Sequence, residues 1–89
     1  MTTRELMDSL YPLTITADRY DGTYSGGRYV AWNLDACDIP DDPFSGDVIC
    51  MEFWDGGHRG YLCGVGDTVG EAVANLYIAM LRKEKGYDN

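Results

Sequence analysis

The side chains best suited to chemistry are a histidine and a cysteine separated by a glycine-containing stretch. His58 and Cys63 lie five residues apart, so a thiol nucleophile beside an imidazole base can be considered. The sequence offers no third residue to orient the base and no identifiable oxyanion hole. Three scattered cysteines and one histidine also lack zinc-finger spacing. We therefore predict no catalytic residues and no enzyme activity.

Three glycines lie where a phosphate-binding loop would lie, between an expected strand and an expected helix. Gly64, Gly66 and Gly70 are spaced G-x-G-x-x-x-G, which differs from the dinucleotide pattern G-x-G-x-x-G. Asp67 beside the helix start would repel a phosphate. The glycines therefore predict a structural turn, and no cofactor is expected.

A run of aspartates could in principle bind calcium. Asp38, Asp41, Asp42 and Asp47 fail the D-x-[DN]-x-[DN]-G pattern and lack the glutamate that completes an EF-hand loop. Prolines are interleaved with them. A solvated acidic loop is the better interpretation, and we predict no metal site.

Negative charge is concentrated in the middle of the chain. The 89 residues carry a formal charge of −8, and the run from Tyr29 to His58 holds seven acidic residues without a lysine or arginine. Such a field repels nucleic acid and anionic membranes and attracts basic protein surfaces. Acidic residues also serve solubility, but a soluble surface normally intersperses both signs of charge.

Aromatic residues lie among or beside these carboxylates, a mixture expected where aromatic anchors have charged surroundings, although some of them must belong to the core. We therefore predict a partner-binding surface, with no direct nucleic-acid binding. Its predicted members are Asp35, Asp38, Asp41, Asp42, Asp47, Glu52, Asp55 and Trp54.

The elements that must position this surface form one domain over residues 1–89, because so short a chain cannot divide its core. Thr2 and Glu5 fit a capping box for a short helix that ends before Pro12. Apolar and polar residues alternate over residues 13–20, and residues 28–34 are rich in β-branched and aromatic types. These two runs predict a hairpin.

The second half begins with a proline-containing loop over 35–47. Residues 47–54 fit neither strand nor helix periodicity well, and we assign them to a third strand. A tight turn over 55–60 and a short strand over 60–66 follow.

The last segment predicts a helix. Thr68 and Glu71 form a second capping box, and Gly86 is the expected cap at the other end. The fold class is α+β: a short N-terminal helix, a three- to four-stranded mostly antiparallel sheet, and a C-terminal helix packed on one face. The predicted apolar stripe is Val69, Ala72, Val73, Leu76, Ala79 and Met80, with Arg82, Lys83 and Lys85 near the end.

The longest apolar runs are shorter than a membrane span, and the first ten residues lack the pattern of an export signal. Three cysteines without a C-x-x-C pair favour reduced thiols. We expect a cytoplasmic protein, in the host cytoplasm if it is phage-encoded, without membrane contact and as a monomer or small homo-oligomer.

Residues 60–82, which include GVGDTVGEAVANLYIAML, resemble the core of the HicB antitoxin fold. In that fold a strand leads through a Gly-Asp-Thr turn into a helix that begins with a Glu-Ala pair. The resemblance implies this strand–helix unit and an antitoxin-type protein that sequesters a basic toxin with its sheet and helix.

In size, charge and domain style the whole chain resembles the small acidic anti-CRISPR proteins of phages. That resemblance implies an inhibitor that binds a CRISPR effector complex, mimics nucleic acid and blocks target DNA binding. The expected partner is a basic nucleic-acid-binding protein such as a CRISPR effector subunit. The HicB-like antitoxin and a structural phage or host accessory protein are the alternatives.

Overall fold

The computed structural model describes residues 2–56 and 60–84. Helices and a small antiparallel sheet make up the α+β architecture, which confirms the predicted fold class. The elements are α1 (Thr3–Ser9), β1 (Thr14–Ala17), β2 (Tyr29–Trp32), η1 (Ala36–Asp38), η2 (Asp42–Phe44), α2 (Asp47–Asp55), β3 (Cys63–Gly66) and α3 (Val69–Glu84).

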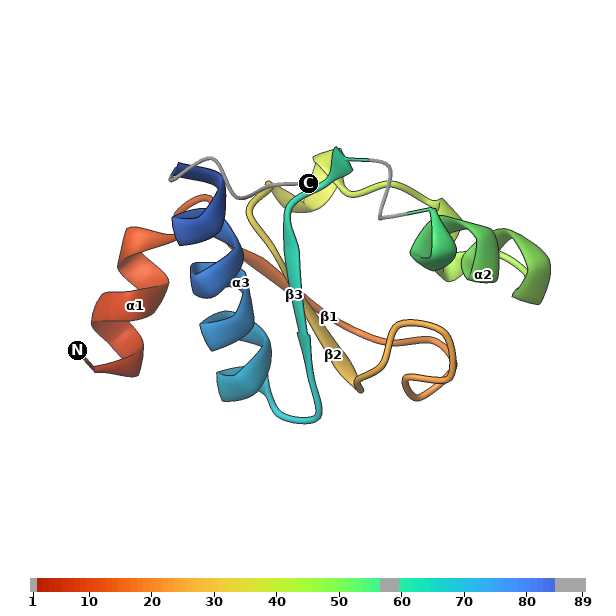
Figure 1. Cartoon of the computed structure of the whole chain (residues 1–89), viewed down its shortest axis with the longest axis horizontal. Helices are drawn as coiled ribbons and strands as arrows, with labels where there is room; N and C mark the ends of the chain where they lie inside the picture. Colours follow the sequence, from red (N-terminus) through yellow and green to blue (C-terminus); the bar gives the residue numbers. More distant parts are fainter. Residues whose placement is uncertain (1, 57–59, 85–89) are drawn as a thin grey trace.

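The sheet has the order β1-β2-β3, and both strand pairs are antiparallel. Thr14 pairs with Trp32 in the predicted hairpin, and Val30 pairs with Val65 across the second pair. Helices lie on both sides of this sheet: α1 and α3 on one side, α2 on the other (Figure 1). The molecule therefore has three layers, with β2 at its centre.

One face of the sheet packs against α3, as the sequence predicts for the C-terminal helix. Leu10 and Ala31 join Ala72, Val73 and Leu76 of α3 in one buried cluster. Close approach of α3 depends on Gly64, where a Cβ atom would clash with backbone atoms of Ala72 and Leu76. The glycines of β3 therefore serve helix–sheet packing.

Both predicted capping boxes are confirmed. Thr2 and Glu5 exchange hydrogen bonds of 3.0 and 3.1 Å, and the Thr68 and Glu71 bonds are both 3.1 Å. In the predicted stripe, Val69 is exposed because it is the first residue of the helix, before α3 reaches the sheet. Lys85 and the expected cap Gly86 lie outside the described residues.

The opposite face of the sheet is covered by α2 and the loop that precedes it. Cys50, Phe53 and Trp54 pack there with Trp32 and Cys63. The strand predicted for residues 47–54 is therefore wrong, since this segment is helical. Its buried residues are spaced i, i+3, i+4, which places them on one helical face.

The loop before α2 is attached to the β1–β2 hairpin. Arg19 Nη1 donates to the carbonyl oxygen of Phe44 at 2.6 Å, and the Tyr20 hydroxyl donates to that of Ser45 at 2.8 Å. On β1, Thr14 Oγ1 donates to the carbonyl oxygen of Leu34 at 2.8 Å. The polar side of β1 therefore faces the layer formed by α2 and the loop that precedes it. No helix in the described ranges has the length and apolar character needed to cross a membrane.

Candidate functional site

The predicted partner-binding surface belongs to one stretch of chain, residues 35–55, which we call the acidic segment. Figure 1 shows that the green helix of this segment, α2, lies across the sheet from α1 and α3. Six of its seven carboxylate side chains are exposed, and Asp42 is half-buried and has interactions of its own. The exposed ones are Asp35, Asp38, Asp41, Asp47, Glu52 and Asp55.

Trp54, a predicted member of the partner-binding surface, lies in the core with 8% of its surface accessible. Its ring meets that of Phe53 edge-on, with centroids 5.0 Å apart, and lies 6.1 Å from that of Trp32. It therefore fastens α2 to the sheet, and its predicted contact with a partner stays a prediction. The i, i+3, i+4 spacing with Cys50 and Phe53 was the signal for this burial.

The outward face of α2 holds residues that the sequence did not single out. Val48, Ile49 and Met51 are 63%, 45% and 39% exposed. Val48 and Met51 share a helical face with Glu52 and Asp55, because residues three, four and seven apart lie on the same side of a helix. Apolar and acidic side chains are thus interleaved on this surface. Recognising the segment as a helix would have revealed it.

A cationic side chain from a distant part of the sequence lies against the acidic segment. Arg19 contacts the segment through Phe44, and its guanidinium lies 5.4 Å from the Tyr20 ring centroid. Burial raises the pKa of the Tyr20 hydroxyl, and the nearby Asp47 carboxylate raises it further. Counting charges along the acidic segment misses Arg19, because this residue belongs to the hairpin.

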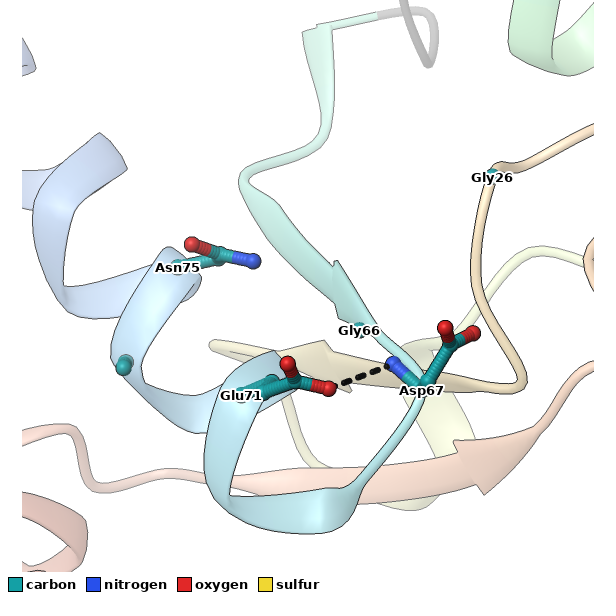
Figure 2. Close-up of a pocket in the computed structure, with 6 residues that line it drawn as sticks. Gly26, Gly66, Asp67, Glu71 and Asn75 are labelled. Carbon is teal, nitrogen blue, oxygen red and sulfur yellow. Dashed lines mark hydrogen bonds between the residues drawn. The ribbon is translucent and has the colours of Figure 1, made fainter.

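A shallow pocket of about 330 Å³ lies on the other side of the sheet, beside the start of α3 (Figure 2). Its polar groups already have structural roles. The Glu71 carboxylate accepts from the backbone N–H groups of Asp67 and Thr68, both at 3.1 Å. Asn75 Nδ2 donates to the carbonyl oxygen of Val65 at 2.6 Å. The pocket therefore results from the capped turn before α3, which agrees with the structural turn that the glycines predict.

The cysteine thiols differ in their surroundings. Burial raises the pKa of Cys63 to about 12 and also raises that of Cys50. Cys37 is exposed. A thiol held in its protonated form is a poor nucleophile. His58, which was considered as the base for Cys63, lies outside the described residues.

Within residues 2–56 and 60–84, no three His, Cys, Asp or Glu side chains are grouped closely enough to hold a metal ion. The exposed acidic and apolar residues of 35–55 are thus the candidate site that the geometry offers. Comparison of the chain with protein-family models, curated proteins and solved structures found no match.

Proposed function

We propose that this protein inhibits a nucleic-acid-binding protein by occupying its basic surface with the acidic segment. The observation that carries the proposal is the segregation of side chains within that segment. Its large aromatic residues turn inward and fix α2 to the sheet, and six carboxylates remain at the surface. A carboxylate array held on a packed scaffold loses little conformational freedom when a partner binds.

The charges suit a partner that normally grips phosphates with lysine and arginine. Exposed carboxylates present such a partner with negative charge, and steering by their field accelerates association about 10- to 1000-fold at low salt. A CRISPR effector complex is the proposed partner, with loss of target DNA binding as the consequence. Inhibition of this type requires no catalysis.

The experiment combines capture of purified CRISPR effector complexes with target DNA binding over a salt series. Expected results are association with an effector and loss of target binding, both weakening as salt rises. Failure to associate with any effector type would contradict the proposal.

Matched charge reversals locate the contact surface. The variant Asp38→Lys/Asp41→Lys reverses two charges in the acidic segment. The variant Asp8→Lys/Asp67→Lys reverses two charges elsewhere, one in α1 and one just before α3. Each reversal adds two units of charge, so both variants carry −4 instead of −8. Only the first is expected to weaken inhibition, by at least about tenfold, since it changes contacts as well as the overall field. Equal effects would show that net charge alone acts.

An antitoxin-type protein is the second candidate, favoured by β3 followed by the capped helix α3. That candidate predicts sequestration of a small basic toxin through the sheet and α3. The same pair of variants separates the two functions. Toxin binding through α3 would survive Asp38→Lys/Asp41→Lys, whereas inhibition through the acidic segment would not.

A further inference from the structure

The outward face of α2 offers apolar contact as well as charge. Val48 and Met51 are exposed and lie three residues apart, and Glu52 and Asp55 occupy the same face. Cys50, Phe53 and Trp54 account for the burial of the opposite face. The outward apolar side chains are therefore not needed to attach the helix to the sheet.

Their residue types are also unfavourable for the helix itself. Val48 and Ile49 are β-branched, which lowers helix propensity at exposed positions. The helix has nine residues, and its N-cap residue, Gly46, supplies no side-chain hydrogen bond, so α2 has little local stability in reserve. Residues whose intrinsic preference disagrees with the element that they occupy are typical of a functional surface.

We propose that this face docks a basic amphipathic helix of the partner protein, with Val48 and Met51 against its apolar stripe and Glu52 and Asp55 against flanking lysine or arginine. The inference rests on the proposed function and names the partner chemistry that the site accepts. Charge complementarity selects a basic occupant, because carboxylates border the apolar pair. Methionine suits such a role since its flexible side chain adapts to different apolar surfaces.

The two kinds of contact differ in how they respond to salt. Attraction between exposed charges is screened, whereas burial of apolar surface persists. A partner held by carboxylates alone would dissociate as salt rises. A partner that also covers Val48 and Met51 retains part of its affinity, which makes the inference measurable.

Two synthetic helical peptides of equal charge are the probes, each about 18 residues long so that helix formation is feasible. One carries a leucine stripe flanked by lysines, and the other replaces every leucine with glutamine. Calorimetric titration of the full chain should show about tenfold tighter binding of the leucine peptide, a difference that corresponds to partial burial of two apolar side chains. The preference should persist at about 0.5 M salt, where exposed charges are screened within a few ångströms.

The variant Val48→Gln/Met51→Gln is expected to lose this preference. Ile78→Gln/Leu81→Gln is the matched control, because these α3 side chains are 44% and 37% exposed and lie on the other side of the sheet. The control should retain the full preference. Circular dichroism melts of both variants verify that each remains folded.

Equal binding of the two peptides to the wild type, or an unchanged preference in Val48→Gln/Met51→Gln, overturns the inference. It is also overturned if sedimentation shows a dimer that this variant abolishes, since the face would then bind a second copy. If the wild type inhibits an effector but binds the two peptides equally, only the docking inference is rejected. Peptide preference without association to any effector rejects only the proposed function.

Discussion

The two helices that cover the sheet are built in different ways. α3 has sixteen residues, a complete capping box and close contact with glycines of β3. α2 has nine residues, has Gly46 at its N-cap without a side-chain hydrogen bond, and is held by Phe53, Trp54 and Cys50. One layer is stabilised by local signals together with backbone proximity, and the other by a few large side chains.

The two layers therefore have different roles: α3 supports the fold, and α2 presents exposed residues. The α3 layer gives the chain a helix whose ends and buried face agree with its sequence. The α2 layer uses three inward residues for attachment and leaves its outer side to acidic and apolar residues. A short helix held by a few large contacts can therefore present a surface that its own helix propensity does not favour.

The largest expected effect tests the attachment of α2. Phe53→Ala should lower the free energy of unfolding by about 4 kcal/mol, because it removes a fully buried ring and leaves a cavity. Urea denaturation measures the loss. Val48→Ala on the outer face of the same helix is the control, with an expected change within about 0.5 kcal/mol. Similar losses in the two variants would contradict the division between attaching and outward faces.

The α3 layer should be most sensitive at its glycine contact. Gly64→Ala places a Cβ atom against backbone atoms of Ala72 and Leu76, which cannot move aside as a flexible side chain would. We expect a loss of about 3 kcal/mol in unfolding free energy from overpacking. Gly46→Ala, where a Cβ has open space, should cost less than about 1 kcal/mol. A tolerated Gly64→Ala would mean that close packing does not distinguish the α3 layer.

Alkaline pH should weaken the α2 side of the core through Cys63. The thiol has a pKa of about 12 in the folded protein against 9.0 as reference, so between these values only the unfolded chain has lost the proton. Stability from this group is complete below pH 9 and falls by about 1.4 kcal/mol per pH unit above it. By pH 10.5 the loss is about 2 kcal/mol.

Denaturation of the wild type and of Cys63→Ala at several pH values isolates this contribution. Tyrosines ionise in the same range, so the difference between the two slopes is the relevant measurement. The Cys63→Ala curve should be flatter above pH 9. Parallel curves would contradict the assignment to Cys63.

The smallest expected effect concerns the contact between the hairpin and the acidic segment. Tyr20→Phe removes the hydrogen bond to Ser45 and should cost about 1 kcal/mol in thermal or urea denaturation. Tyr24→Phe leaves that hydrogen bond intact and controls for the loss of a hydroxyl group. If the two variants are equally stable, the loop before α2 depends on other contacts.

Sequence reasoning found the elements whose signals are local. The Thr2 and Thr68 capping boxes and the hairpin pattern predicted α1, α3 and the β1–β2 pair. Residues 47–54 were misassigned because Val48, Ile49 and Met51 are apolar but face outward. They mask the helical spacing of the buried residues.

Tertiary contacts account for what else was missed at the candidate site. Arg19 and Phe44 are 25 residues apart, so counting charges within a window could not find their contact. Trp54 could not be assigned to the core until its segment was known to be helical. Of the aspartates expected in a solvated acidic loop, Asp38, Asp41 and Asp47 are exposed and Asp42 is half-buried, whereas their partner stays a prediction.

The Asn75 side chain has a consequence for self-association. β3 is an outer strand of the described sheet, and Asn75 already donates to its Val65 carbonyl oxygen. An incoming strand would have to compete with this amide for the acceptor. Outer strands with unpaired backbone groups are templates for aggregation. One amide on α3 thus occupies a backbone acceptor that an added strand would need.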